Sequence, residues 1–422
     1  MIVRNITVLL RMIFDIRSYR LLKRIHSMYK NDPLYSLKKI IVSSLNTVKN
    51  DKINYFNNDY IVTSFLPPLF SNAFISVLEA VRESENKFTQ QAHAKRCGPI
   101  SFFLSITDRC NYNCIHCSAK NRAGNNELTT DEWLQTIKNI QDIKTAIIGF
   151  TGGEALMRDD LTRMIRSVHD DSITILYTNG RLLSYEKAVE LKSAGLYAVG
   201  VSFDSFNENE HNAIRNNQSG FSDAVCALQN ASRAGLYTIA QLVLLRNRID
   251  KKFVYEYMKF VKKLGVHEVR ILEPIKAGHL LNENDDFFLT KDDRKRLINI
   301  QKYINNIPGM PKLTTFAHTE SFEQFGCGAG TQHSYITSEG ELLPCDFVPL
   351  SFGNVKRKPL SRLWREMNDT MGNPKDGCFA FTIQNDLQKN KSLQFPLPEE
   401  ISKEICAAHK KEEFPKFYRI LR

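Results

Sequence analysis

Three cysteines stand close together with the spacing C-x3-C-x2-C: Cys110, Cys114 and Cys117, called here the cysteine triplet. Three thiolates can hold three irons of a four-iron cluster and leave the fourth iron without a protein ligand. That open position is where a second molecule could be bound and activated. The alternative is a structural zinc site, which needs four ligands. His116 would have to be the fourth, but it is adjacent to Cys117, and adjacent residues rarely bind one tetrahedral ion.

A Gly-Gly-Glu turn directly follows the apolar run 146–150. Its glycines, Gly152 and Gly153, carry no Cβ and allow the backbone to approach a ligand closely. The carboxylate of Glu154 can accept hydrogen bonds from an ammonium group. Because the turn comes shortly after the cysteine triplet, it is a candidate ligand site.

Two later segments also carry polar side chains. Ser202 and Asp204 stand at the end of the apolar run 198–203, and Arg215 lies in a helical stretch soon after it. These groups could contact a ligand, and a guanidinium can pair with a carboxylate through two hydrogen bonds. The structural alternative for each of them is a helix cap or a solvated loop.

Two more cysteines lie in the C-terminal third of the chain, on either side of a predicted hairpin. Cys327, Gly340 and Cys345 have the spacing C-x12-G-x4-C. The hairpin is predicted from two short runs, Ser334–Thr337 and Glu341–Pro344. Cysteines are also common as buried free thiols, so this pattern alone leaves both interpretations open.

The elements expected to position these groups alternate between strands and helices. Apolar runs predict six strands, at Ser101–Thr107, Ala146–Phe150, Ile173–Tyr177, Ala198–Phe203, Thr238–Leu244 and Glu268–Glu273. Periodic stretches between them predict helices at Asp131–Ile143, Asp159–His169, Ser184–Ala194, Phe221–Ala234 and Lys252–Leu264. This recurrence predicts an α/β fold with a parallel sheet, and six such units predict an open or closed β/α barrel. The cysteine triplet follows the first strand, where barrel loops build active sites.

Outside this alternation the sequence predicts other elements. The N-terminal region is expected to be helical, with a second helical stretch at 72–85. After Pro274 the alternation is expected to stop, because residues 275–320 are mixed and polar. The expected domains are a helical extension at 1–95, a core at 98–310 and a small C-terminal domain with a tail at 311–422.

The cysteine triplet and the segments after it resemble the radical S-adenosylmethionine (SAM) superfamily over roughly residues 100–365. The resemblance implies a partial (β/α)6 barrel, a 4Fe–4S cluster on the triplet, and SAM on the open iron. Reduction of the cluster would cleave SAM to a 5′-deoxyadenosyl radical that abstracts hydrogen from a substrate. The resemblance also implies an external one-electron reductant such as a flavodoxin or ferredoxin.

The same resemblance implies roles for the other candidate residues. The Gly-Gly-Glu turn looks like the family motif that binds the SAM amino group. Arg215 resembles the arginine that pairs with the SAM carboxylate, and His116 occupies a position that is usually aromatic and packs near the adenine. Ser202 and Asp204 are candidates for contacts with SAM or substrate, and Asp204 is the expected catalytic residue.

The C-terminal cysteines resemble the opening of the SPASM and twitch domains, which bind auxiliary iron–sulfur clusters. A SPASM domain continues with four closely spaced cysteines and then a seventh, whereas only Cys378 and Cys406 follow here. That departure favours a shortened, twitch-like domain with one auxiliary cluster. Cys327, Cys345 and Cys378 are its expected ligands, and the fourth could be Cys406, another residue or the substrate.

The positive charge of the chain is concentrated near its start. The 422 residues carry a formal net charge of +11, of which residues 1–50 contribute +8. Apolar residues such as Ile6, Leu9 and Ile13 recur there at helical spacing among Arg and Lys. We expect this helix either to pack on the body or to lie on the anionic inner face of a membrane. Few aromatic residues accompany the basic ones, so no nucleic-acid partner is expected.

The nine cysteines fall into the triplet and scattered positions, which favours metal or redox chemistry in a reducing cytoplasm. No apolar run reaches the about 18 residues that span a bilayer. The resemblance to relatives with auxiliary domains implies a peptide or protein side chain as the leading candidate for the substrate. The alternatives are a membrane-associated enzyme acting on a lipid or isoprenoid, a small metabolite as substrate, and a non-catalytic iron–sulfur electron-transfer protein.

Overall fold

The computed structural model describes residues 8, 10–32, 36, 38, 51–63, 65–82, 94–119, 126–410 and 413–421. Ile6 and Leu9, from which the N-terminal helix is in part predicted, lie outside these residues. In the described part of the chain, no helix is both long and apolar enough to cross a membrane.

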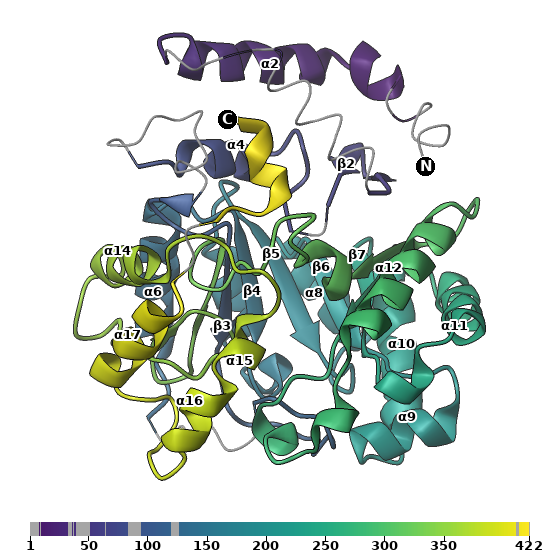
Figure 1. Ribbon diagram of the computed structural model, residues 1–422. Coiled ribbons are helices and arrows are strands. Elements are labelled where there is room, and N and C mark those ends of the chain that lie inside the picture. The colour runs from purple at the N-terminus through teal and green to yellow at the C-terminus, as the bar shows by residue number, and fades with distance from the viewer. Residues whose placement is uncertain are drawn as a thin grey trace.

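A nine-stranded sheet organises the molecule (Figure 1). Its strand order is β11-β10-β3-β4-β5-β6-β7-β8-β9, and all neighbours are parallel except β10 and β11. The α/β class is confirmed, and the sheet is open, with β11 and β9 at its edges. The strands are β3 (Ser101–Ser105), β4 (Ile147–Thr151), β5 (Ile173–Thr178), β6 (Ala198–Ser202), β7 (Tyr237–Val243), β8 (Glu268–Leu272), β9 (Lys312–Thr315), β10 (His333–Ile336) and β11 (Leu342–Leu343).

Helices connect the parallel strands and pack against the sheet (Figure 1). They are α6 (Thr130–Asp142), α7 (Leu161–Arg166), α8 (Tyr185–Ser193), α9 (Glu208–Arg215), α10 (Gly220–Arg233), α11 (Lys251–Lys263) and α12 (Lys291–Asn305). The five predicted helices are confirmed. In α11, for example, Val254, Tyr257, Met258 and Val261 recur at helical spacing and are buried. Strand β4 is apolar and buried over four consecutive residues, as expected for a parallel strand covered on both faces.

The alternation continues past Pro274, where the sequence pattern predicts a stop. Helix α12 leads into β9, which pairs in parallel with β8 and adds a seventh strand. Strand β9 carries a lysine and two threonines beside a single leucine, so it has no apolar run from which a strand could be predicted. Lys312 is nevertheless buried, because its ammonium group donates to Val62 O at 2.9 Å and pairs with Asp51 at 3.0 Å. A buried charge requires such partners, and here they come from the N-terminal region.

The N-terminal region lies over the N-terminal ends of the strands (Figure 1). Its elements are α2 (Ile16–Tyr29), β1 (Asn54–Phe56), β2 (Asp59–Ile61) and α4 (Asn72–Glu79). The hairpin of β1 and β2 was not among the predicted elements. Its turn residues, Asn57 and Asn58, have φ values of 47° and 65°, as a tight two-residue hairpin turn requires.

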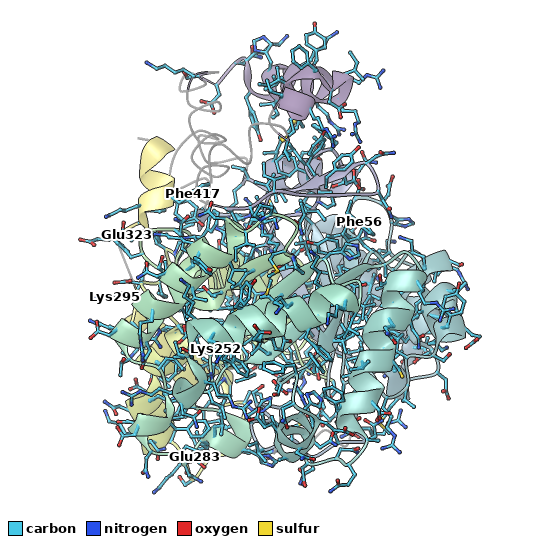
Figure 2. All side chains as sticks on the ribbon, turned by 90° about the vertical axis from the view of Figure 1, so that its right-hand side faces the viewer. Phe56, Lys252, Glu283, Lys295, Glu323 and Phe417 are labelled. Atoms are coloured by element: carbon cyan, nitrogen blue, oxygen red, sulfur yellow. The ribbon has the colours of Figure 1, made fainter. Side chains whose placement is uncertain are left out.

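Side chains of this region pack on the sheet and on one another. Phe56 is labelled in Figure 2. Its ring centroid lies 5.4 Å from that of Tyr237 and 4.6 Å from that of His267. In α2, the Tyr29 hydroxyl donates to Leu78 O at 2.6 Å. The described part of the predicted N-terminal helix therefore packs on the rest of the molecule.

The C-terminal region begins with the predicted hairpin, which is confirmed by the antiparallel pairing of β10 and β11. Strand β10 also pairs in parallel with β3, so the hairpin extends the main sheet past the expected domain boundary. The remaining helices are α13 (Phe316–Thr319), α14 (Leu360–Met371), α15 (Phe379–Thr382), α16 (Gln384–Lys389) and α17 (Glu399–Ala408), and the short 3-10 turns are η1 (Ala155–Met157), η2 (Arg246–Arg248), η3 (Gly278–Leu280), η4 (Asp285–Phe287) and η5 (Lys416–Leu421).

Candidate functional site

The cysteine triplet lies in the loop after β3, at the C-terminal ends of the parallel strands. Cys110, Cys114 and Cys117 line one cavity of about 1160 Å³, and His116 lines it with them. Burial raises the pKa of Cys110 to about 11, and charges on Cys114 and Cys117 are among the neighbours that raise it further. The three thiols therefore lie within electrostatic range of one another. Three neighbouring thiols facing a cavity fit a four-iron cluster with one iron open to a ligand.

The Gly-Gly-Glu turn after β4 holds the cysteine loop in place. Gly153 N donates to Thr107 O at 2.7 Å, and Glu154 N donates to Arg109 O at 2.8 Å. Gly152 has a φ of +144°, and a Cβ at this position would lie 2.2 Å from Thr107 O. Only glycine allows the two loops to approach this closely.

The Glu154 carboxylate is buried and lines the cavity. Its Oε1 accepts from Thr178 Oγ1 at 2.8 Å and Leu156 N at 3.0 Å, and its Oε2 accepts from Asn179 N at 2.8 Å. Burial raises the pKa of Glu154, and these three donors oppose the shift because they stabilise the charged form. A carboxylate has about four acceptor sites, so one remains for an ammonium donor from the cavity.

Arg215 and Asp204 form a buried ion pair beside the triplet. Arg215 Nε lies 2.6 Å from Asp204 Oδ2, and Arg215 Nη1 donates to Cys114 Sγ at 3.7 Å. Burial acts to raise the pKa of Asp204, but the guanidinium of Arg215 holds it below its usual value. Arg215 and Ser202 line the cavity, whereas Asp204 does not. Asp204 was expected to contact SAM or substrate; its carboxylate instead contacts Arg215 and the backbone of Val243.

A loop after β8 also contacts the triplet, although no pattern in the sequence pointed to it. His279 Nδ1 forms a hydrogen bond with Cys114 O at 2.8 Å, and His279 N donates to Cys117 O at 3.0 Å. Gly278 has a φ of +55°, and a Cβ there would lie 2.1 Å from Cys117 O. The loop therefore fixes the backbone of two candidate ligands. The glycine just before a histidine was the one signal available in the sequence.

Gly278→Ala is expected to displace the loop that carries the cysteine triplet and to lower the amount of iron bound by the triplet. Gly235→Ala is the matched control, because Gly235 also has a positive φ (+75°) but an added Cβ would meet nothing within 4 Å. Both variants carry the cost of a positive φ, about 1–2 kcal/mol. The additional loss in Gly278→Ala measures the overlap with Cys117 O. Thermal unfolding and iron analysis compare the two, and equal losses would contradict the role of this contact.

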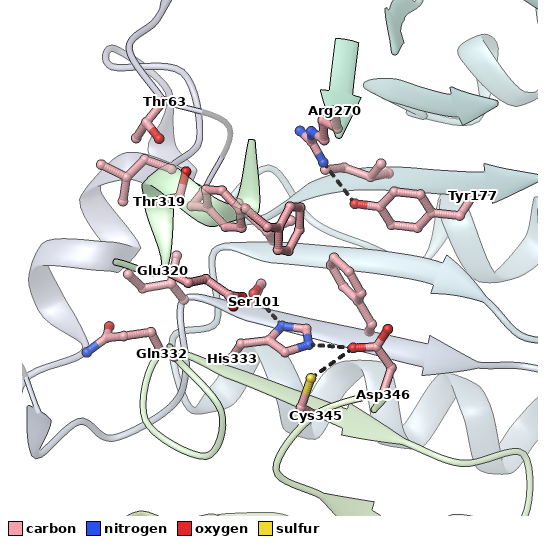
Figure 3. Close-up of a pocket in the computed structure, with 18 of the residues that line it drawn as sticks. Thr63, Ser101, Tyr177, Arg270, Thr319, Glu320, Gln332, His333, Cys345 and Asp346 are labelled. Atoms are coloured by element: carbon pink, nitrogen blue, oxygen red, sulfur yellow. Dashed lines mark hydrogen bonds and ion pairs between the residues drawn. The ribbon is translucent and has the colours of Figure 1, made fainter. Parts of the chain in front are cut away.

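The cavity continues from the triplet along the sheet, where polar and aromatic groups line it. Arg270 Nη1 donates to Tyr177 Oη at 3.0 Å (Figure 3). Arg270 Nε also pairs with Glu268 at 3.0 Å. Gln241 also lines the cavity, and its Oε1 is buried without a hydrogen-bond partner among the described residues. This carbonyl oxygen is available to a donor on a bound molecule.

The C-terminal cysteines line the same cavity as the triplet. Cys327, Cys345 and Cys378 face it from three different segments. The Cys378 thiol donates to the Cys327 sulfur, which lowers the pKa of Cys327 to about 6, and the N–H groups of Ala329 and Phe379 act in the same direction. Burial raises the pKa of Cys345. A sulfur atom surrounded by N–H donors is typical of an iron–sulfur ligand.

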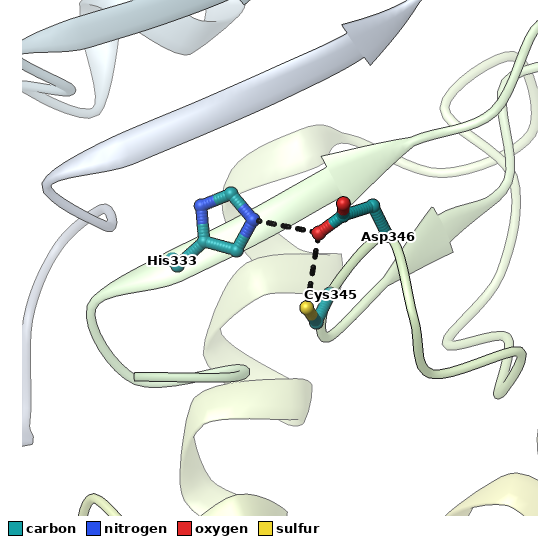
Figure 4. Close-up of side chains that lie close together, drawn as sticks. All are labelled: His333, Cys345 and Asp346. Atoms are coloured by element: carbon teal, nitrogen blue, oxygen red, sulfur yellow. Dashed lines mark hydrogen bonds and ion pairs between the residues drawn. The ribbon is translucent and has the colours of Figure 1, made fainter. Parts of the chain in front are cut away.

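Two residues without thiols lie beside Cys345. Cys345 Sγ donates to Asp346 Oδ1 at 3.1 Å, and His333 Nε2 lies 3.6 Å from the same oxygen (Figure 4). The three ligand atoms lie within 4.8 Å of one another. The sequence predicted the hairpin but not this group, because neither His333 nor Asp346 belongs to a spaced ligand pattern of its own. Cys406 is buried in α17 and does not line the cavity.

Family comparisons agree with this arrangement. The model described as the radical SAM superfamily matches residues 104–259, and the model described as an iron–sulfur cluster-binding domain, SPASM, matches residues 327–384. The first range contains the triplet, Glu154 and Arg215. The second contains the three C-terminal cysteines that line the cavity.

Curated relatives resemble the chain over most of their length. An AdoMet-dependent heme synthase of Methanosarcina barkeri is 27% identical over 285 residues, which cover 61% of this chain and 80% of the relative. An Fe-coproporphyrin III synthase of the same organism is 24% identical over 295 residues, which cover 63% of this chain and 74% of the relative.

Solved structures share the fold at low sequence identity. Streptococcus suis SuiB bound to precursor peptide SuiA has a TM-score of 0.55 at 15% identity, with 65% of this chain and 66% of that chain covered. Native anSMEcpe with bound AdoMet and Kp18Cys peptide has a TM-score of 0.51 at 19% identity, with 63% and 80% covered. At these identities the likeness establishes the fold alone.

Proposed function

Because this chain belongs to the radical SAM superfamily and carries a C-terminal SPASM domain, we propose that it removes a hydrogen atom from a substrate held between its two cysteine sites. The observation that carries the proposal is that the triplet and the C-terminal cysteines line one continuous cavity. The cofactors of such an enzyme are a 4Fe–4S cluster, SAM and further iron–sulfur centres. When bound, the cluster and SAM supply a 5′-deoxyadenosyl radical.

Residues of the chain would hold these groups in place. The triplet would bind three irons, and the Glu154 carboxylate would accept hydrogen bonds from the SAM amino group, with Gly152 and Gly153 allowing close approach. Arg215 would pair with the SAM carboxylate, and Asp204 would position Arg215. An external one-electron reductant, such as a flavodoxin or ferredoxin, would supply the electron.

His116 and Ser202 would complete the SAM pocket, because both line the cavity next to these groups. Burial lowers the pKa of His116 to about 4. Its imidazole is therefore neutral near pH 7 and suited to packing against an adenine ring. Ser202 offers a hydroxyl at the end of β6, on the same rim as Arg215.

The C-terminal cysteines would hold an auxiliary cluster that exchanges single electrons. Cys327, Cys345 and Cys378 supply three thiolates, and the fourth position would be taken by Asp346 or His333 rather than Cys406. This assignment follows from the lining of the cavity, which includes Asp346 and His333 but omits Cys406.

Asp346→Ala and His333→Ala are expected to weaken binding of the auxiliary cluster by about 10–100-fold and to change its EPR spectrum, because a ligand or its neighbour is lost. The signal of the triplet cluster should remain. Cys406→Ala is the control, and it should leave both signals unchanged. A change in Cys406→Ala alone would instead assign the fourth ligand to that thiol.

Three observations bear on the substrate class, and they support different classes. Solved neighbours were crystallised with a precursor peptide and with the Kp18Cys peptide, which supports a peptide or protein side chain. One relative is named a heme synthase, so relatives of this chain also make molecules that are not peptides. The cavity is also lined by aromatic residues of the N-terminal region, among them Phe65, Phe70 and Phe74, and this apolar lining supports the lipid or isoprenoid class.

The reaction is tested with the anaerobically reconstituted wild-type protein, reduced with dithionite and supplied with SAM. We expect 5′-deoxyadenosine and methionine in equal amounts, and only when both SAM and reductant are present. Protein with both clusters loaded that forms neither product would be an electron carrier, which would overturn the proposed function.

A further inference from the structure

The cavity extends beyond the cysteine sites to the opposite end of the sheet. The triplet follows the C-terminal end of β3, whereas α4 contacts the turn just before β5, where Ser76 Oγ donates to Asp171 O at 2.9 Å. Residues at both ends line the same cavity. A five-residue strand such as β4 spans about 17 Å. The cavity is therefore a channel long enough for an extended chain.

The far half of this channel is apolar. Its lining comes from α2, from residues 62–63 and 65–81 and from the first residues of the strands, and it includes Ile25, Tyr29, Phe65, Phe70, Phe74 and Ile147. Arg96 is a charged residue of this lining, and its Nε and Nη2 groups donate to Gly98 O and Val77 O. An extended peptide would leave its backbone groups without partners here, whereas a hydrocarbon chain has none to satisfy.

The channel opens to solvent alongside α2. Ile13, Tyr19 and Leu22 line the channel, yet their exposed fractions are 69%, 65% and 40%. Side chains that line a channel and are also largely exposed mark the rim of an opening. This opening lies at the end of the channel away from the triplet. A long substrate that enters here can therefore extend through the channel until one of its ends reaches the triplet.

The helix at this rim carries both apolar and basic side chains on its surface. Phe14 and Ile16 are 84% and 61% exposed. Residues 10–32 contain six Lys/Arg and two Asp. Of these bases, Arg20 and Lys23 are exposed and form no ion pair with any described residue. Exposed apolar residues among unpaired cations are the features that bind a helix to an anionic membrane surface.

We propose that the substrate is a membrane lipid with an anionic headgroup, whose hydrocarbon chain enters the channel beside α2 while the headgroup stays at the basic rim. The inference rests on the proposed function, because the same radical then acts on the lipid. One C–H bond of the chain breaks, and a C–H bond forms at the 5′ carbon of 5′-deoxyadenosine. A carbon radical is left on the lipid.

The transfer is tested on the wild-type enzyme with phosphatidylglycerol vesicles whose acyl chains are fully deuterated. We expect mass spectrometry to find one deuterium atom in 5′-deoxyadenosine, and none with unlabelled vesicles. SAM cleavage without deuterium transfer would overturn the lipid proposal and leave the proposed function standing. Failure to cleave SAM under any of these conditions would instead overturn the proposed function.

Membrane contact is tested separately by co-sedimentation of the full chain with vesicles. Phe14→Asp is expected to lower binding to phosphatidylglycerol vesicles by about tenfold or more, because burial of an aromatic side chain is lost. Leu393→Asp is the matched control, because Leu393 is also an exposed apolar residue (39%). It follows α16, which lies at the opposite end of the molecule from α2 (Figure 1). Equal binding of the two variants, or equal binding of wild type to phosphatidylcholine, would overturn the proposal.

Discussion

Cys114→Ala is expected to abolish formation of 5′-deoxyadenosine and to remove about four irons per chain, because two thiolates do not hold a four-iron cluster. Cys114 is the buried member of the triplet, and its sulfur lies 3.7 Å from the guanidinium of Arg215. Its loss would therefore remove a proposed iron ligand and a contact of the proposed SAM pocket together. Anaerobic reconstitution, iron analysis and product chromatography measure the effect.

The control for this substitution is Cys226→Ala. Cys226 lies exposed on α10 and does not line the cavity, so iron content and product formation should equal those of the wild type. The EPR signal of the auxiliary cluster should persist in Cys114→Ala, which would separate loss of one cluster from unfolding. Retention of SAM cleavage by Cys114→Ala would contradict the assignment of the triplet.

Arg215→Met is expected to lower the free energy of unfolding by about 3–5 kcal/mol and to abolish SAM cleavage. The Asp204 side chain is fully buried, so removal of the guanidinium leaves an uncompensated charge in the interior. The same substitution removes the group proposed to bind the SAM carboxylate. Urea unfolding of the cluster-free protein measures the first effect, and product chromatography of the loaded protein measures the second.

The double variant Asp204→Asn, Arg215→Met separates these two effects. With both charges removed, most of the lost stability should return, because no unpaired charge remains buried. SAM cleavage should stay absent, since the guanidinium is still missing. If the double variant were as unstable as Arg215→Met, the ion pair would not be the source of the stability.

The pH dependence follows from the pKa of Asp204. In the wild type, Arg215 holds this pKa below its usual value against the effect of burial. The pair therefore stabilises the fold above the unfolded-state pKa of about 4, and this contribution is lost as the pH falls through the lower folded-state pKa. In Arg215→Met, burial alone would raise the pKa of Asp204. The destabilisation by this substitution should then be smaller at about pH 5 than at about pH 7. Urea unfolding at both values checks the sign.

Local patterns were sufficient for most of the sheet. Parallel strands covered on both faces are rich in apolar residues. Strands β4 and β6 are almost entirely apolar, and even β7 and β8, which contain Gln241, Glu268 and Arg270, keep enough apolar residues to be recognised. The helices between them show one buried face, as α11 does with Val254, Tyr257 and Val261. The triplet and the Gly-Gly-Glu turn each lie within one short segment of the chain, so the sequence shows the spacing of their residues directly.

Contacts between distant segments were not visible in the same way. Strand β9 was not predicted, because its Lys312 is buried against Asp51, about 260 residues away in the chain. The contact of the loop at Gly278 and His279 with the triplet was not predicted, because its partners are backbone carbonyls of the triplet. Every residue has a backbone carbonyl, so residue types do not indicate which carbonyl accepts a hydrogen bond. A buried, paired charge cannot be distinguished from a surface charge in the sequence until its partner is known.

The sequence by itself determined which chemistry the chain carries, because the ligand types and their spacing are local properties. Only the tertiary structure decided that both cysteine groups share one cavity, that Asp204 faces Arg215 rather than that cavity, and that the channel ends at an opening beside α2. These facts depend on how strands and loops far apart in the chain are brought together. Burial and pairing of that kind are set by the packed fold as a whole, and no single segment encodes them.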